Sequence, residues 1–340
     1  MATSLDVRGL TIELPSHCGW IRPVNDVSFT LARGETLGIV GESGSGKTML
    51  SLALMGLEPH GARHDGEAWL HLRSANGNGK NGPHNGTADS EQPGENLLAL
   101  SSEKMREVRG REIAMIFQEP MTALNPVLRI GAQIEEAIRV HQPAASANEI
   151  RSRALAAIER AALSDPARRA RQYPHQLSGG LRQRVMIAMA LAAGPGVLIA
   201  DEPTTALDVT VQKQILELLA KLRRELQLSM LFITHDLGVV AQVADRVVVM
   251  YAGRIVEAGP VAEVLRAPRH PYTEGLLRAA PRLAREKLVP IPGTVPALDA
   301  LPVGCAFAAR CPHRVAQCDA TIPALRAVNE RHHARCILVP

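Results

Sequence analysis

The sequence predicts an α/β protein in which a glycine-rich loop joins a buried strand to a helix. The loop, residues 41–48, reads Gly-Glu-Ser-Gly-Ser-Gly-Lys-Thr. Residues 37–40 before it are apolar, as a buried strand would be, and residues 49–55 after it are typical of a helix. Glycines let a backbone wrap closely around an anion, and a helix N-terminus favours negative charge. This context favours a phosphate-binding loop over the alternative, a glycine-rich turn with a solvated lysine.

Each residue of this loop has an expected part in holding ATP with Mg²⁺. The amides of about residues 43–48 would point at the phosphates, and Lys47 would reach the β- and γ-phosphates. The Thr48 hydroxyl would ligate Mg²⁺. The predicted ATP contacts in the loop are therefore Gly41, Glu42, Ser43, Gly44, Ser45, Gly46, Lys47 and Thr48.

Size and composition restrict the class of protein. The chain has 340 residues, which suits about two domains, and its net charge of +4 is too mild to imply nucleic acid. Its first residues lack the basic start and apolar core of a secretory signal. The longest apolar run, 185–200, is interrupted by Gly-Pro-Gly and is shorter than a membrane span. We expect a soluble or peripheral protein of the cytoplasm.

Three further apolar runs, each typical of a buried strand, are followed directly by polar residues. These residues are Gln118, the pair Asp201 and Glu202, and His235. Asp201 suits a Mg²⁺ position, as does Gln118 at the carboxyl edge of a sheet, and Glu202 suits a base that orients water. His235 would touch a γ-phosphate or position water. Taken alone, a glutamine at a strand end is usually a surface residue and a lone histidine is more often structural.

A second set of exposed amides precedes a predicted helix. Ser178, Gly179 and Gly180 would form an anion site there, the alternative being an ordinary helix cap. Asp208 follows the acidic pair within the same predicted loop. Residues 130–172 between these motifs have apolar positions at helical spacing, which predicts an inserted helical subdomain.

The regions before and after the phosphate loop differ in character. Residues 3–40 alternate short apolar runs with turns, as an antiparallel β-layer would, and Trp20 within them would either stack on adenine or pack structurally. Residues 74–96 have no hydrophobic residue except two alanines, which predicts a flexible surface insertion with a solvated His84. Cys18 is expected to be a small buried residue.

In this order the motifs resemble the ATP-binding cassette of ABC transporters, from about residue 5 to 259. The resemblance implies a P-loop NTPase fold with a RecA-like core, an antiparallel β-subdomain and an inserted helical subdomain, followed by a small cysteine-containing extension. The predicted boundaries are 1–259 for the cassette, about 120–178 for the helical subdomain, about 74–96 for the insertion and 260–340 for the extension.

The same resemblance implies how the motifs act. Two cassettes would pair head to tail, and each ATP would lie between loop 41–48 of one subunit and residues 178–180 of the other. Glu202 would be the general base, His235 the switch histidine and Gln118 the sensor linked to a membrane partner. Asp208 would belong to the side that meets the partner's ATP.

The last 80 residues resemble the tail of oligopeptide/dipeptide importer ATPases, the peptide/nickel type. Residues 269–273, Arg-His-Pro-Tyr-Thr, and 290–293, Pro-Ile-Pro-Gly, carry part of this likeness. The rest lies in a Cys-x5-Cys-x6-Cys-x17-Cys pattern formed by Cys305, Cys311, Cys318 and Cys336. Four thiolates suit Zn²⁺ or an iron–sulfur cluster, and reduced structural thiols remain an alternative. The resemblance favours a [4Fe–4S] cluster. His332 and His333 are expected at the surface.

The function expected from these motifs is the ATPase subunit of an importer of di- and oligopeptides. Its partners would be a second, different ATPase subunit, two transmembrane permease subunits and, indirectly, an extracytoplasmic solute-binding protein, at the cytoplasmic face of the inner membrane. Alternative solutes are nickel, opines, glutathione and sugars. A soluble repair or translation ATPase is disfavoured because the chain has one cassette and no long coiled coil. A non-catalytic cassette is disfavoured because Glu202 and His235 are both present.

Overall fold

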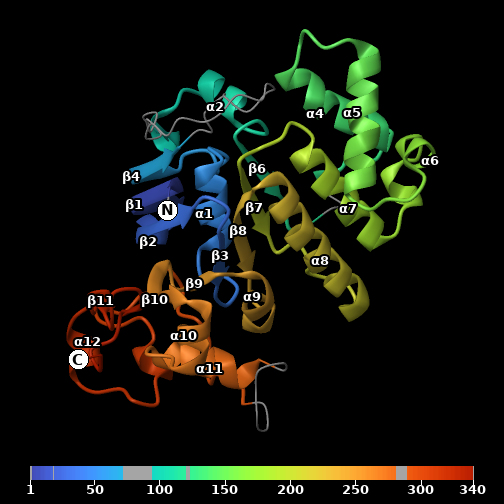
Figure 1. The fold of residues 1–340 in the computed structure, drawn as a ribbon. Coiled ribbons are helices and arrows are strands. Elements are labelled where there is room, and N and C mark those ends of the chain that lie inside the picture. Colours follow the sequence, from blue (N-terminus) through green and yellow to red (C-terminus); the bar gives the residue numbers. More distant parts are fainter. Residues whose placement is uncertain (1, 18, 72–93, 120–122, 281–288, 340) are drawn as a thin grey trace, which may run out of the picture.

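The computed structural model describes residues 2–17, 19–71, 94–119, 123–280 and 289–339. The larger of two β-sheets lies at its centre, and the smaller sheet lies beside it (Figure 1). Helices α4 to α6 lie at one side of the molecule, and the C-terminal extension lies at the opposite end. Among the described residues, no helix combines the length and apolar character needed to cross a membrane.

The larger sheet has the strand order β11-β12-β10-β9-β3-β8-β7-β6. Strands β9, β3, β8, β7 and β6 are parallel, whereas β10, β11 and β12 join by antiparallel pairing. The bounds are β3 Thr36–Val40, β6 Ile113–Ile116, β7 Val197–Asp201, β8 Ser229–Thr234, β9 Arg246–Tyr251, β10 Arg254–Pro260, β11 Arg326–Ala327 and β12 His333–Ala334.

Continuous apolar sequence explains why the central strands pair in parallel. Every residue of β3, β6, β7 and β8 is buried, as is usual in sheets covered on both faces. The register places Val40 beside Thr234 and Asp201 beside Ile233. The carboxyl ends of these strands therefore reach the same edge of the sheet, where the sequence placed Gln118.

The smaller, antiparallel sheet has the order β2-β1-β4-β5. Its strands are β1 Thr3–Ser16, β2 Gly19–Ala32, β4 Arg63–Leu70 and β5 Glu95–Asn96. The antiparallel layer was predicted. The turns expected between the short apolar runs are wrong within residues 3–14, because β1 is one continuous strand there. Register shifts, one of them between Val7 and Leu10, bend it where Gly9 has a φ of +57°.

The predicted insertion 74–96 lies mostly outside the described residues, and so do His84 and Cys18. Its last two residues, Glu95 and Asn96, belong to the sheet as β5. The Asn96 side chain accepts hydrogen bonds from the backbone amides of Ala68 and Leu98. This end of the segment is therefore ordered by pairing with β4, which its polar composition did not reveal.

The helices cover the sheets and form a separate group at the side. The prediction of helices within residues 130–172 agrees with α4 to α6, while the subdomain boundaries stay a prediction. The described α-helices before the extension are α1 Lys47–Leu54, α2 Ser102–Val108, α4 Ile130–His141, α5 Ala147–Arg160, α6 Pro166–Ala170, α7 Gly179–Leu191, α8 Val209–Leu226 and α9 Leu237–Val243.

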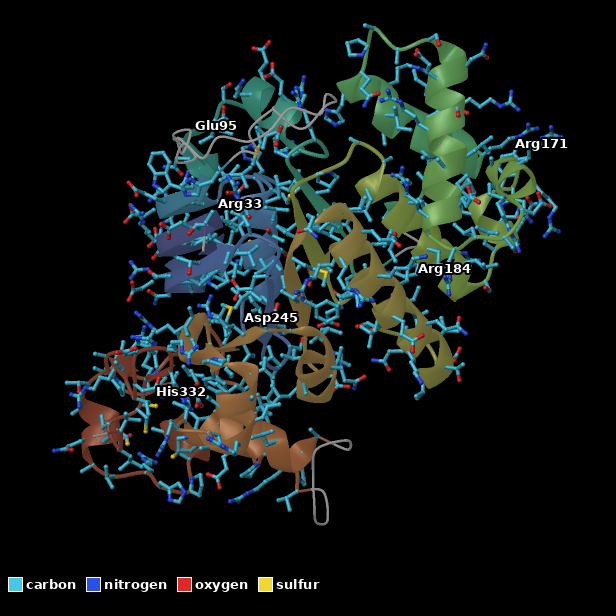
Figure 2. The ribbon with its side chains drawn as sticks, viewed as in Figure 1. Arg33, Glu95, Arg171, Arg184, Asp245 and His332 are labelled. Atoms are coloured by element: carbon cyan, nitrogen blue, oxygen red, sulfur yellow. The ribbon has the colours of Figure 1, made fainter. Side chains whose placement is uncertain are left out.

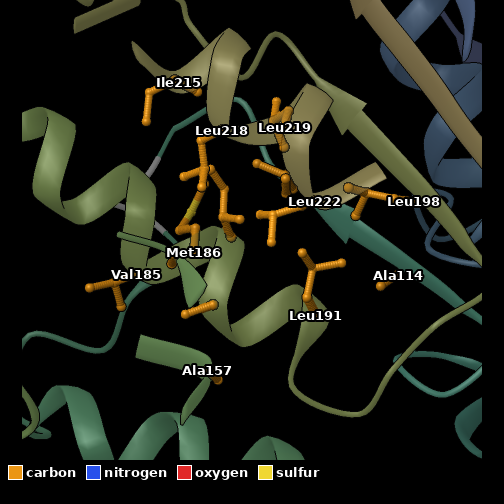
Figure 3. Packing of buried hydrophobic residues seen from close by; sticks show 14 of the residues in the cluster. Ala114, Ala157, Val185, Met186, Leu191, Leu198, Ile215, Leu218, Leu219 and Leu222 are labelled. Carbon is orange, nitrogen blue, oxygen red and sulfur yellow. The ribbon is translucent and has the colours of Figure 1, made fainter. Parts of the chain in front are cut away.

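Helices α7 and α8 connect the side group to the main sheet. Leu218 and Leu222 of α8 pack with Met186 and Leu191 of α7 and with Leu198 of β7 in one buried cluster (Figure 3). Burial of such side chains stabilises a fold by about 1.5–3 kcal/mol each. This packing fixes the N-terminal ends of α7 and α8 relative to the carboxyl end of β7.

The C-terminal extension adds α10 Val261–Arg266, α11 Pro271–Ala279 and α12 Gln317–Ala320, together with β11 and β12. The prediction that His332 lies at the surface is wrong, because its side chain is 3% exposed within the extension (Figure 2). Its Nε2 lies 2.7 Å from Oε1 of Glu257, which is fully buried in β10. The Glu257 carboxylate also accepts hydrogen bonds from the backbone amides of Arg269 and His270. A buried carboxylate requires such partners. The sequence did not reveal that His332 is one of them, because the two residues lie 75 positions apart.

We expect His332→Ala to lower the free energy of unfolding by about 1.5–3 kcal/mol, because it removes a hydrogen-bond partner of the buried Glu257 carboxylate. Chemical denaturation measures this change. The matched control is His333→Ala, since the neighbouring side chain is half-buried and has no side-chain hydrogen bond in the described part of the chain. An equal, small effect of both substitutions would contradict the structural importance of the Glu257 pair.

Candidate functional site

The glycine-rich loop between β3 and α1 is held close to two other backbone segments. Gly46 has a φ of +100°, and a Cβ there would lie 1.9 Å from the carbonyl oxygen of Pro23. A Cβ on Gly41 would lie 2.3 Å from the carbonyl oxygen of Met250. Both positions therefore require glycine. The tight approach fixes the loop's path and leaves its amides at the N-terminus of α1, where an anion is favoured.

Lys47 lies inside this loop with its ammonium group directed at oxygen atoms. Its Nζ donates to the carbonyl oxygens of Gly41 at 2.7 Å and Glu42 at 2.9 Å, and to Oγ of Ser45 at 3.2 Å. Burial lowers the pKa of Lys47, and the carboxylates of Glu202, Asp201 and Glu42 oppose that shift. The Lys47 side chain is thus already held at the loop, and phosphate oxygens would be stronger partners for an ammonium group than neutral carbonyls.

Asp201, at the end of β7, is the residue that best suits a bound cation. It is 1% exposed, and its Oδ1 has no hydrogen-bond partner among the described residues. Burial raises its pKa, while hydrogen bonds from Thr48 and Ser51 lower it. An unpartnered, buried carboxylate oxygen beside a hydroxyl suits a divalent cation such as Mg²⁺. Asp201 and Thr48 therefore fit the predicted metal position.

Glu202 is the point at which three strand ends meet. Its Oε2 lies 3.3 Å from Nδ1 of His235, which follows β8, and 3.2 Å from Nε2 of Gln118, which follows β6. The Thr205 hydroxyl donates to the same oxygen at 2.7 Å. Glu202 itself has a φ of +46°, a rare conformation for a non-glycine residue, and its amide donates to Ile233. The structure thus brings together the three residues that the sequence predicted as catalytic beside Lys47.

The charges in this cluster support one another. The hydrogen bond with His235 lowers the pKa of Glu202, burial opposes that shift and the Thr205 hydroxyl reinforces it. The same hydrogen bond raises the pKa of His235. Glu202 therefore stays ionised at neutral pH, as a group that accepts a proton must be.

The predicted second anion site lies at the start of α7. Ser178 caps this helix without a side-chain hydrogen bond, and a Cβ on Gly180 would lie 2.5 Å from Val211 of α8. Asp208 caps α8 through the amides of Thr210 and Val211. Within the described residues, no hydrogen bond joins residues 177–180 to the phosphate loop. The amides at the start of α7 therefore do not meet the loop of their own chain.

Trp20 and Gln118 each contact another side chain of this chain. Trp20 is 44% exposed, and the guanidinium of Arg63 lies 3.9 Å from the centre of its ring. One face of the indole is thus already covered, and its contact with adenine stays a prediction. Gln118 contacts Glu202, and its role as a Mg²⁺ ligand also stays a prediction.

The four cysteines of the extension line one small cavity, together with His270 and Phe307. All four are free thiols: Cys305, Cys311, Cys318 and Cys336. Burial raises the pKa values of Cys305, Cys311 and Cys336, and neighbouring thiols add to this effect. In the part of the chain that the structure describes, no group of three or more His, Cys, Asp or Glu residues could hold a metal ion. The predicted [4Fe–4S] or zinc centre therefore has no support here.

Sequence reasoning missed several residues that complete the site. Thr205 holds Glu202, and Ser51 contacts Asp201 at 3.3 Å. The position of Thr205 three residues after Glu202 was a readable signal, because a turn brings such residues together. Arg310 and Tyr272 of the extension contact the phosphate loop, and no local pattern pointed to them.

These features define a nucleotide-hydrolysing cassette of the P-loop class. They are the phosphate loop, a buried aspartate that suits a metal ion, and a glutamate where the ends of three strands meet. The ABC transporter family model matches residues 24–205, and the C-terminal region of oligopeptide/dipeptide transporters matches residues 256–318. The chain belongs to the ABC transporter family and carries that C-terminal region.

Relatives and solved structures agree with this assignment. A protein of Brucella ovis, named as a putative peptide import ATP-binding protein, is 52% identical over 98% of this chain and 96% of its own length. A similarly named protein of Brucella abortus is 47% identical over 98% and 95%.

Two solved structures share the cassette fold. The dimeric, post-hydrolysis ATP-binding cassette MJ0796 with ADP and Pi has a TM-score of 0.61 and 28% identity, over 76% of this chain and 98% of that chain. The cbiO1 protein of Clostridium perfringens, part of the ABC transporter complex cbiONQ, has a TM-score of 0.60 and 25% identity, over 78% and 92%.

We expect Thr205→Val to raise the pKa of Glu202, because it removes a hydrogen bond that stabilises the carboxylate. The acid limb of the pH profile of kcat should move to higher pH, since Glu202 must be ionised to accept a proton. Steady-state ATPase assays across pH measure the limb. Thr204→Val is the matched control, because Thr204 contacts Gln212 and not Glu202. Coincident acid limbs for Thr205→Val and the unmodified chain would contradict this role.

Proposed function

We propose that this chain is the ATP-hydrolysing subunit of an importer for di- and oligopeptides. The observation that carries the ATPase part is the convergence of Gln118, Glu202 and His235 beside the loop that holds Lys47. The match of the extension to the C-terminal region of oligopeptide/dipeptide transporters supports the peptide part. Other solutes are the alternative, because the transported molecule would not touch this subunit.

In this proposal each residue near the strand ends has one task. Lys47 and the loop amides bind the β- and γ-phosphates, and Thr48 and Asp201 hold Mg²⁺, which neutralises phosphate charge when bound. Glu202 orients a water molecule and accepts its proton as the water oxygen attacks the γ-phosphorus. The bond from that phosphorus to the ADP oxygen breaks, giving ADP and phosphate. His235 and Thr205 keep the Glu202 carboxylate in position through their hydrogen bonds.

A second cassette would complete the site. Ser178, Gly179 and Gly180 present amides at the start of α7 and do not contact the phosphate loop of their own chain. They would therefore serve ATP bound to a partner, with Asp208 beside them. The peptide-import type of tail favours a related but different ATPase as that partner.

The surface near Gln118 suits a permease. An apolar groove of about 540 Å³ lies between the end of β6, α4 and α7, with Phe117, Val140 and Met189 among its lining residues. Two of its lining side chains are exposed: Val140 is 65% exposed and Phe117 is 39% exposed. Contiguous apolar surface of this kind is typical of a protein-interaction site. Phe117 adjoins Gln118, which contacts Glu202, so a permease segment seated on Phe117 would be linked to the catalytic base through Gln118.

Two such permease subunits would hold the chain at the cytoplasmic face of the membrane as a peripheral subunit, with a solute-binding protein acting from the other side. No nucleic acid takes part in this proposal. No step of it uses a metal at the four cysteines of the extension, where the described residues support neither [4Fe–4S] nor zinc.

Lys47→Ala and Glu202→Gln test the ATPase part. Lys47→Ala should weaken ATP binding by at least about a hundredfold, because it removes the side-chain cation expected at the phosphates. Glu202→Gln should keep ATP binding, lose turnover and accumulate as a closed pair of cassettes, since binding no longer leads to hydrolysis. Equilibrium ATP binding, phosphate release and size-exclusion chromatography measure these results. Unchanged phosphate release by Glu202→Gln would remove this residue from the role of base.

Val140→Glu tests the permease groove. A charge on this exposed position should weaken assembly with the permease and reduce peptide uptake by the reconstituted importer, while ATP binding verifies that the variant is folded. Val303→Glu is the control, because Val303 is 81% exposed in the extension, away from the groove. Equal assembly and uptake by both variants would exclude the groove as the docking surface.

A further inference from the structure

The phosphate loop contains a carboxylate, Glu42, within a segment that binds an anion. A like charge there would repel the phosphates of ATP, which makes the position of Glu42 costly unless it is neutralised. The Glu42 side chain is 31% exposed, and its charge is among those that act on the pKa of Lys47. Glu42 is therefore close enough to matter to the group that would bind the phosphates.

The neutralising partner comes from the C-terminal extension, 268 residues further along the chain. The guanidinium of Arg310 donates to both carboxylate oxygens of Glu42, at 2.7 and 3.0 Å. The Arg310 side chain is only 4% exposed, and its Nε donates to the carbonyl oxygen of Pro292 at 2.8 Å. A bidentate pair of this kind is both strong and directional. Arg310 thus fixes the orientation of Glu42 as well as compensating its charge.

The extension also contacts the backbone of the loop. The Glu42 amide donates to the Tyr272 hydroxyl at 2.8 Å, and Tyr272 is fully buried. Its ring packs with those of Tyr251 and Phe307, with centroids 4.6 and 5.4 Å away. Arg310 donates to the Tyr251 hydroxyl at 3.3 Å. Side-chain and backbone contacts to Glu42 therefore come from one packed aromatic cluster.

We propose that Arg310 is a positioning residue for ATP binding, which makes the C-terminal extension a functional part of the phosphate site. By neutralising and orienting Glu42, it keeps the loop ready for the β- and γ-phosphates, and Tyr272 fixes the adjacent backbone. The inference rests on the proposed binding of ATP at residues 41–48. It goes beyond that proposal because it assigns a role in nucleotide affinity to the C-terminal extension. The family match of that extension, to oligopeptide/dipeptide transporters, concerns the transported solute.

The test is a double-mutant cycle on the full chain, with Arg310→Gln, Glu42→Gln and the double substitution. Affinity for ATP without hydrolysis is measured by isothermal titration, and kcat and KM by ATPase assay. Arg310→Gln should weaken ATP binding by about tenfold and raise KM, while kcat changes little, because the phosphate loop then carries an uncompensated negative charge. In the Glu42→Gln background the same substitution should have almost no effect.

Several controls separate this role from a purely structural one. Arg314→Gln is the matched control, because Arg314 lies in the same extension but pairs with the exposed Asp319; it should leave ATP affinity unchanged. If Arg310→Gln does not fold, Arg310→Lys keeps the charge, loses the bidentate geometry and should give an intermediate loss of affinity.

Two results would overturn the inference. The first is an equal loss of ATP affinity from Arg310→Gln in the unmodified chain and in the Glu42→Gln variant. The second is a lower melting temperature of the Arg310 variants with unchanged affinity. Lys47→Ala distinguishes the underlying proposal: if it loses ATP binding while Arg310→Gln does not, only the inference about the extension fails. If Lys47→Ala binds ATP normally, the phosphate loop itself has been assigned wrongly.

Discussion

The parallel pairing of β3, β8, β7 and β6 is the constraint on which the site depends. Parallel strands end at the same edge of a sheet, so the loops that follow them must meet there. The phosphate loop, His235 and Gln118 each follow one of these strands, and the acidic pair lies at the end of β7. Their convergence requires no long-range recognition between the loops themselves, because the backbone hydrogen bonds of the sheet already bring them together.

Electrostatic balance is the second requirement of this edge. Glu202, Asp201 and Glu42 lie close enough to Lys47 for their charges to oppose the lowering of its pKa by burial. A site that receives a polyanion cannot leave three carboxylates uncompensated. The negative charge of each carboxylate is compensated in a different way. Glu202 is stabilised by His235 and Thr205, Asp201 keeps an oxygen atom suited to a cation, and Glu42 is paired with an arginine from outside the cassette.

This balance also explains why the extension packs where it does. The buried Glu257–His332 pair joins β10 to the segment before β12, and the aromatic rings of Tyr251, Tyr272 and Phe307 fill the space beside the phosphate loop. The C-terminal extension, which matches a region of oligopeptide/dipeptide transporters, is thereby packed against the nucleotide-binding loop. Its cysteines line a small cavity in the same packed unit.

The sequence by itself determined the α/β fold, the phosphate loop and the order of the strand-end residues, because these depend on local patterns of apolar runs, glycines and polar residues. It predicted the helices between residues 130 and 172 for the same reason. Tertiary structure alone decided the burial of His332, the continuity of β1 and the contact of Arg310 with Glu42. These features join residues up to 268 positions apart, and no local pattern records which distant side chain compensates a buried charge.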